Sequence, residues 1–125
     1  MTEIDKTEGV EQSCLFCKII KRKIPADIVF EDDDVLCFKD INPQTPIHLL
    51  LIPKKHIPTM NDIAEDDFML MGKLSANIHK IAEQEGFDEK GFRVVINTNK
   101  AAGQVVWHIH YHILAGKERF GWSPG

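Results

Sequence analysis

Residues 105–114 have the sequence VVWHIHYHIL, in which apolar side chains alternate with three of the chain's six histidines. Such alternation is typical of a β-strand, because successive side chains point to opposite faces of a sheet. His108, His110 and His112 are therefore expected on one face, with imidazoles starting about 6.6 Å apart at a rise of ~3.3 Å per residue. The side chains expected on the opposite, core-facing side are Trp107, Ile109, Tyr111 and Ile113.

Three imidazoles in a row are hard to explain by packing, and two kinds of chemistry use them. Neutral imidazoles ligate metals, or one of them acts as a nucleophile while its neighbours orient it and handle protons. The spacing alone favours neither. Gly103, just before the strand, allows backbone N–H groups to approach an anion closely, and Asn97 offers a side-chain amide. The surroundings thus predict a phosphorylated substrate lying across His110, Asn97 and the backbone of 104–106.

The remaining pattern places this strand in an α+β domain. We expect a short helix over 14–23, strands over 28–31, 35–39, 48–52 and 92–96, and a long amphipathic helix over 65–85. Because the strands follow one another through short turns and a single long helix interrupts them, a mostly antiparallel sheet is favoured over a βαβ fold. Neither glycine-rich nucleotide fingerprint, G-x-G-x-x-G or G-x-x-x-x-G-K-[ST], is present.

Length and composition restrict the class of protein further. The chain has 125 residues, the size of one domain, and a formal net charge of −4, which argues against duplex nucleic acid or anionic membrane as partners. No apolar run approaches the ~18 residues of a membrane span. Residues 1–13 are polar and lack the apolar core of a secretion signal, so we expect a disordered tail. Three cysteines fit a reducing, cytoplasmic compartment better than a disulfide framework.

The run from His108 to Leu114, preceded by Gly103-Gln104, resembles the motif of the histidine triad (HIT) superfamily. The similarity continues through Phe16-Cys17-Lys18-Ile19-Ile20, Ile24-Pro25-Ala26, Phe38-Lys39-Asp40-Ile41-Asn42-Pro43-Gln44, His48 and Leu51-Ile52-Pro53-Lys54-Lys55-His56. Together these motifs resemble the Hint branch, the purine nucleoside phosphoramidases, over residues 14–125. The resemblance implies one HIT domain with a five-stranded antiparallel sheet, one long and one short helix, and a homodimer joined through the long-helix side and the strand at 92–96.

The resemblance also implies a covalent mechanism. His110 would attack the α-phosphorus of a purine nucleoside 5′-phosphoramidate, or of an acyl-adenylate, and expel the leaving group. Water would then release the nucleoside monophosphate from the nucleotidyl-histidine. His112 would contact the phosphate, His48 would assist proton transfer near the leaving group or orient the triad, and His108 would complete the catalytic histidines. No cofactor is required for this chemistry.

By the same resemblance, several further residues would bind substrate. Asn97, with the backbone of 103–106, would hold phosphate oxygens, and Asp40 with Ile41 would meet the ribose. The expected purine pocket comprises Phe16, Ile19, Ile24 and Phe38, and the expected phosphate loop comprises Gly103, Gln104, Val105 and Val106. Trp122, in the C-terminal tail, would reach the active site of the partner subunit. Val105 departs from the family, because relatives often carry a polar residue there and valine cannot donate a hydrogen bond.

Cys14-x-x-Cys17 is a weak metal signal alone, because a structural zinc ion needs four ligands. In zinc-bearing members of the superfamily, such a pair is completed by two histidines that correspond to His56 and His108. The resemblance therefore implies a structural Cys₂His₂ zinc site in this chain.

Three other functions remain open. A dinucleoside polyphosphate hydrolase is the nearest, although the C-terminal Trp122-x-Pro124-Gly125 favours the phosphoramidase. A non-catalytic nucleotide-binding scaffold is disfavoured because the complete set of site histidines is retained. In a metal-dependent hydrolase, the triad would ligate a catalytic metal and chelators would inhibit the enzyme.

Overall fold

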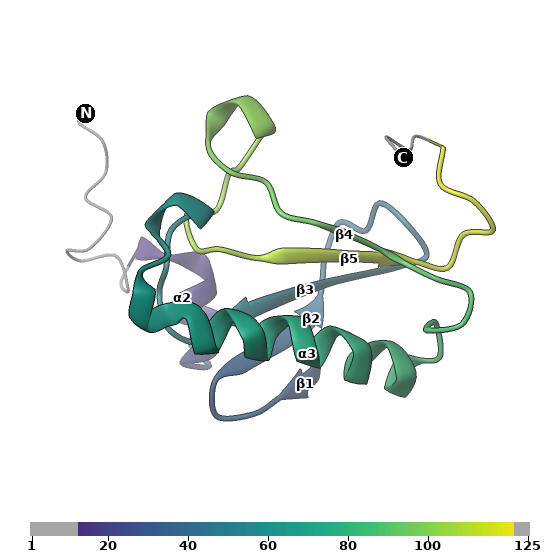
Figure 1. Ribbon diagram of the computed structural model, residues 1–125, viewed down its shortest axis with the longest axis horizontal. Coiled ribbons are helices and arrows are strands. Elements are labelled where there is room, and N and C mark those ends of the chain that lie inside the picture. Colours follow the sequence, from purple (N-terminus) through teal and green to yellow (C-terminus); the bar gives the residue numbers. More distant parts are fainter. Residues whose placement is uncertain (1–12, 122–125) are drawn as a thin grey trace.

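A five-stranded antiparallel sheet with the strand order β1-β2-β3-β5-β4 forms the centre of the computed structural model, which describes residues 13–121 (Figure 1). The strands are β1 (Ile28–Glu31), β2 (Val35–Lys39), β3 (Ile47–Pro53), β4 (Arg93–Val95) and β5 (Tyr111–Ala115). The sequence-based prediction of a five-stranded antiparallel α+β fold is confirmed. The expected disordered tail lies almost wholly outside the described residues and stays a prediction.

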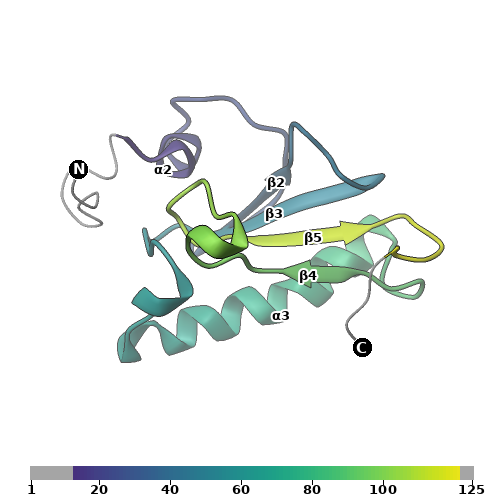
Figure 2. The same cartoon turned by 90° about the horizontal axis from the view of Figure 1, so that it is seen from above.

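Two helices cover opposite faces of this sheet. The long helix α3 (Phe68–Glu85) packs on one face and the short helix α2 (Leu15–Ile20) on the other, as Figure 2 shows. Burial on both faces explains why β2 and β3 are almost continuously apolar, since a strand with one solvated face would alternate. Among residues 13–121, no helix is long and apolar enough to cross a membrane.

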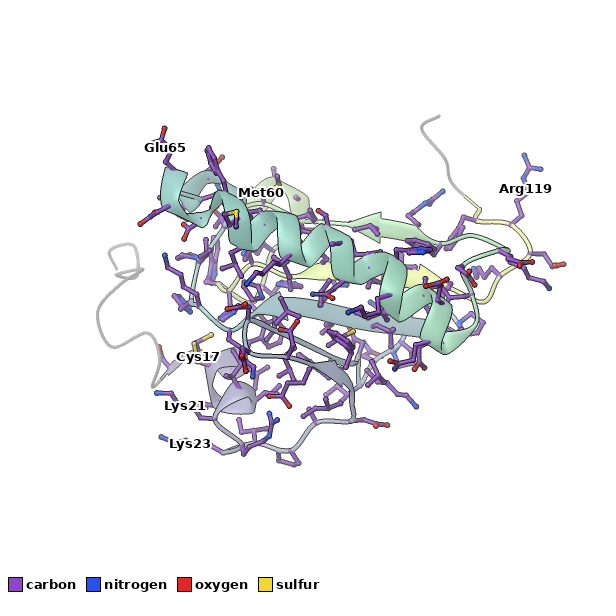
Figure 3. The ribbon with its side chains drawn as sticks, turned by 60° about the horizontal axis from the view of Figure 1, so that its bottom comes forward. Cys17, Lys21, Lys23, Met60, Glu65 and Arg119 are labelled. Atoms are coloured by element: carbon purple, nitrogen blue, oxygen red, sulfur yellow. The ribbon has the colours of Figure 1, made fainter. Side chains whose placement is uncertain are left out.

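The long helix begins later than its apolar periodicity predicts. Glu65–Asp67 form a 3₁₀ turn, η2, before the α-helix proper, and Gly86 ends the helix in the left-handed region at φ 82°. Figure 3 shows that Glu65, before the start of α3, and Cys17 of α2 lie at the same end of the molecule, with Arg119 at the other end. The inner face of α3 contributes Leu74, Ile81 and Ala82 to the core.

The strand expected over 105–114 is shorter and lies later, at Tyr111–Ala115. The ladder between β3 and β5 ends at the pair Leu51–Tyr111, and the preceding segment leaves the sheet, since the Ile109 N–H donates to the Ile57 carbonyl, beyond the end of β3, at 2.6 Å. Trp107 therefore lies outside the strand. The prediction that its side chain packs in the core is wrong, because this side chain is 38% exposed. Ile109, Tyr111 and Ile113 do point into the core beneath α3.

Truncation of the inner face of α3 tests this packing. Leu74→Ala should lower the free energy of unfolding by about 2–5 kcal/mol, because a fully buried leucine leaves a cavity. Met69→Ala, on the same helix but 79% exposed, is the matched control and should change it by less than about 0.5 kcal/mol. Urea denaturation measures both; equal effects would contradict the assigned face.

Candidate active site

Two histidines from neighbouring strands meet on the face of the sheet that α2 covers. Leu50 of β3 lies opposite His112 of β5. His48, two residues before Leu50, is therefore the diagonal neighbour of His112 on the same face of the sheet. The His48 Nε2 and the His112 Nδ1 are 2.9 Å apart. His110 packs beside His112 with ring centroids 5.0 Å apart. The structure thus brings together histidines that are more than 60 residues apart in the sequence.

The hydrogen bonds around His48 determine its tautomer. The Gln44 backbone N–H donates to the His48 Nδ1 at 3.0 Å, so the neutral ring carries its proton on Nε2 and donates it to the His112 Nδ1. His112 then carries its own proton on Nε2. A carboxylate oxygen of Asp40 lies 3.4 Å from the His48 Nε2. Although these three residues lie close enough for a metal, the His48 nitrogen has no lone pair to offer, so the arrangement is a hydrogen-bond relay.

His110 has the opposite arrangement, with a nitrogen available for attack. Its Nδ1–H donates to the His108 carbonyl at 2.8 Å, which leaves the lone pair on Nε2. Phe16 packs edge-on against the ring, with centroids 5.1 Å apart, and restricts its rotation.

Burial keeps these imidazoles neutral. Desolvation lowers the pKa of His110 and of His48, in both cases against the opposing effect of Asp40. Desolvation, reinforced by the neighbouring His110 and His48, lowers the pKa of His112 to about 4. At neutral pH the site therefore presents neutral imidazoles, each with one N–H and one lone pair, the state in which a nitrogen can act as a nucleophile.

A cavity of about 280 Å³ opens beside His110 and His112. Its lining contains most of the residues predicted to bind substrate, namely Phe16, Ile19, Ile24, Phe38, Asp40, Ile41, Val105 and Val106. Phe16 and Phe38 meet edge to face, 5.5 Å between centroids, at the apolar part. The lining also includes residues that we did not predict: Leu15, Pro25, Ala26, Lys39 and Leu50. Leu50 was detectable, since it is two residues from His48 on one strand.

Three other predicted substrate residues do not line this cavity. The buried Gln104 side chain donates to the Pro58 and Val106 carbonyls at 2.8 and 3.0 Å and accepts from the Asn99 N–H at 2.8 Å, so it braces the loop. Gly103, at φ 85°, ends the short helix η3 (Lys100–Ala102). Asn97 is not part of the cavity lining. Trp122 lies outside the described residues.

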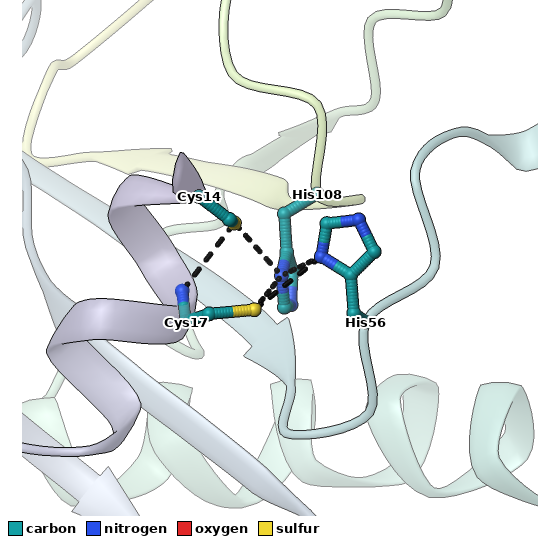
Figure 4. Close-up of side chains that lie close together, drawn as sticks. All are labelled: Cys14, Cys17, His56 and His108. Carbon is teal, nitrogen blue, oxygen red and sulfur yellow. Dashed lines mark hydrogen bonds between the residues drawn. The ribbon is translucent and has the colours of Figure 1, made fainter. Parts of the chain in front are cut away.

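A second cluster consists of Cys14, Cys17, His56 and His108, whose side chains turn toward one another (Figure 4). The two cysteines lie at the start of α2, where the Cys14 Sγ also accepts the Cys17 N–H. His108 donates its Nε2–H to the Pro53 carbonyl at 2.8 Å, which leaves the Nδ1 lone pair facing the cluster. Sequence spacing alone pointed only to the cysteine pair.

Four of the six distances between the donor atoms are close to those between tetrahedral metal ligands. The His108 Nδ1 lies 3.5 Å from the Cys14 Sγ, 3.6 Å from the Cys17 Sγ and 3.2 Å from the His56 Nδ1, and the Cys17 Sγ lies 3.4 Å from the His56 Nδ1. Metal–ligand bonds of 2.0–2.3 Å in a tetrahedron place ligand atoms about 3.3–3.8 Å apart. The geometry and the donor types fit Zn²⁺.

An α+β fold whose antiparallel sheet presents histidines at alternate positions, beside an apolar cavity, is typical of histidine triad proteins. Comparison with known proteins agrees, because residues 21–119 match the HIT domain family. The chain belongs to this family.

Three proteins illustrate the similarity. The purine nucleoside phosphoramidase of Escherichia coli K12 is 48% identical over 106 residues, which cover 85% of this chain and 89% of the relative. The crystal structure of a HIT family hydrolase from Legionella pneumophila Philadelphia 1 superposes with a TM-score of 0.85 at 51% identity, over 90% of this chain and 99% of that one. An uncharacterised HIT-like protein of Synechococcus elongatus is 46% identical over 93% of this chain and its own full length.

The lowered pKa of His112 predicts loss of stability in acid. An unfolded histidine binds a proton near pH 6.5, whereas folded His112 does so only near pH 4, so the unfolded state gains protons first as pH falls between these values. The free energy of unfolding should therefore decrease from pH 6.5 toward pH 4. His112→Asn should reduce this slope in thermal melts, whereas His79→Asn, at an exposed position of α3, should not. An unchanged slope in His112→Asn would contradict the assignment.

Proposed function

We propose that this HIT protein is a purine nucleoside phosphoramidase that hydrolyses nucleoside 5′-phosphoramidates through a nucleotidyl intermediate on His110. The observation that supports this proposal most directly is the tautomer and position of the His110 ring. Its Nδ1–H is bound to the His108 carbonyl, and its free Nε2 lies at a cavity with an apolar wall. The identity to the Escherichia coli phosphoramidase supports it.

The reaction has two displacements at phosphorus. The His110 Nε2 lone pair forms a bond to the α-phosphorus while the phosphorus–nitrogen bond breaks, and the departing amine takes up a proton. That proton comes from solvent, because the neutral imidazoles of the Asp40–His48–His112 relay have no extra proton to give; the relay instead keeps a hydrogen on the His112 Nε2. Water then attacks the phosphorus and gives up a proton to solvent, the bond to His110 breaks, and the monophosphate leaves. Each step keeps charge on the phosphate, where the His112 N–H stabilises it.

We propose that the rest of the cavity binds the nucleoside. The aromatic rings of Phe16 and Phe38 offer a wall for a purine, with Ile19 and Ile24 beside them. Asp40, which lines the cavity next to Ile41, would accept hydrogen bonds from the ribose hydroxyls. The backbone at Val105 and Val106 is the proposed phosphate cradle, with Asn97 as a further donor. The exposed Val105 side chain removes one polar contact to the leaving group.

We also propose that the Cys₂His₂ cluster holds a structural zinc ion. Its ligands would be Cys14, Cys17, His56 and His108, the four donors that already face one another. A bound ion would tie the N-terminal helix to the segment before β5. None of the proposed displacement steps needs it.

A homodimer completes the proposal. The strand β4 is an edge of the sheet, and edge strands are available for pairing with a second chain. Joining two copies there would let the tail of one chain, including Trp122, reach the site of the other.

Substitution of the proposed nucleophile tests the mechanism. His110→Asn should reduce hydrolysis of adenosine 5′-phosphoramidate by at least about 1,000-fold, because no covalent intermediate can form. Wild-type protein denatured at alkaline pH during turnover, where the phosphorus–nitrogen bond survives, should carry a covalent adenylyl group detected by mass spectrometry, and the variant none. His79→Asn is the control and should retain normal turnover. Substantial turnover by His110→Asn would exclude covalent catalysis at this residue. Faster hydrolysis of diadenosine polyphosphates than of adenosine 5′-phosphoramidate would instead favour the alternative, a dinucleoside polyphosphate hydrolase.

Metal analysis tests the zinc proposal. Protein purified from zinc-supplemented medium should contain one zinc per chain, and the double substitution Cys14→Ser, Cys17→Ser should contain none. Cys37→Ser is the matched control, because Cys37 is a buried cysteine of β2 outside the cluster. Absence of zinc from the wild type, or its retention by the double variant, would contradict the proposed ligand set.

A further inference from the structure

We infer that the Cys₂His₂ cluster and the nucleotide cavity are energetically coupled, so that a metal ion at Cys14, Cys17, His56 and His108 strengthens nucleotide binding and nucleotide strengthens metal binding. The inference rests on the proposed function. It goes beyond a structural role for the metal, which requires only that the ion stabilise the fold.

The first link between the two sites is the helix α2. This helix has six residues, too few to be stable by itself, so contacts made by its side chains hold it in place. Cys14 and Cys17 at its start belong to the cluster, whereas Leu15, Phe16 and Ile19 line the cavity. A ligand at either site therefore favours the same docked position of α2.

The second link is the Phe16 ring, which lies between the two cysteines in the sequence. It packs edge-on against His108 at 5.9 Å, against His110 at 5.1 Å and against Phe38 at 5.5 Å between centroids. One buried side chain thus contacts a metal ligand, the nucleophile and the purine wall. Any shift of α2 moves all three contacts together.

The third link is His108, whose ring and backbone serve different sites. The ring Nδ1 faces the cluster and Nε2–H is bound to the Pro53 carbonyl, so a metal would fix the ring at both nitrogens. The backbone carbonyl accepts the His110 Nδ1–H that aims the nucleophile. Fixing the His108 ring therefore fixes the acceptor that orients His110.

These links define two states of the chain. In the docked state, α2 closes the cavity wall and the four cluster donors converge; in the undocked state, both are lost. A ligand shifts such an equilibrium only by its different affinity for the two states, and both ligands here prefer the docked one. Linkage then requires the two effects to be reciprocal, with equal factors.

Isothermal titration with AMP, on the full chain, tests the coupling. The dissociation constant of AMP should be at least about 5-fold larger for chelator-stripped protein than for protein reloaded with one equivalent of Zn²⁺. The double variant Cys14→Ser, Cys17→Ser should match the stripped protein, and Cys37→Ser should match the loaded wild type. Phe16→Leu should keep its zinc but bring the two dissociation constants closer together.

Competition with a chelating zinc indicator gives the reciprocal measurement on folded, loaded wild type. Saturating AMP should raise the apparent zinc affinity by the factor seen in the titration. This measurement does not need the double variant, and Phe16→Leu separates coupling through α2 from stabilisation of the whole fold, because AMP should raise the zinc affinity of that variant by a smaller factor. Equal AMP affinity with and without zinc, or a zinc affinity that AMP leaves unchanged, would overturn the coupling and leave the proposed function intact. Failure of AMP to bind either form would overturn both.

Discussion

The hydrogen bond from the His110 Nδ1–H to the His108 carbonyl, 2.8 Å long, is the contact on which the candidate site depends. It places the proton on one ring nitrogen and leaves the other free at the cavity. Since the carbonyl belongs to the same segment, its direction depends on what holds that segment: the Pro53 carbonyl at one nitrogen of the His108 ring, and the cysteine cluster at the other. A local backbone feature thus sets the tautomer of His110, the proposed nucleophile.

The sheet separates two tasks between its faces. The α3 face is a continuous apolar core, and it provides the rigidity of the scaffold. The α2 face is smaller and mixes apolar packing with histidines and cysteines. Because the central strands β2 and β3 are buried on both sides, a side chain such as His48 is held by the strand itself, and the site inherits that rigidity.

Periodicity in the sequence predicted most of the architecture. The alternating and continuous apolar runs located all five strands, and the three- and four-residue spacing located α3, because burial on one or both faces leaves a direct trace in the order of residues. The same reasoning failed before Tyr111. The alternation extends over residues 105–110, which do not pair with β3 although β3 continues to Pro53. Pairing is a property of two segments that one segment does not reveal.

The sequence by itself determined the candidate nucleophile region, the α+β class and the family resemblance, since each follows from residues that are neighbours in the chain. Only the tertiary structure decided how those residues interact. In the folded chain, the Gln104 side chain holds its own loop together, and His48 forms a hydrogen bond with His112. Cys14 and His108, from opposite ends of the chain, lie in contact. Hydrogen-bond partners and tautomers depend on distances between atoms that are far apart in sequence, and only the folded chain brings those atoms together.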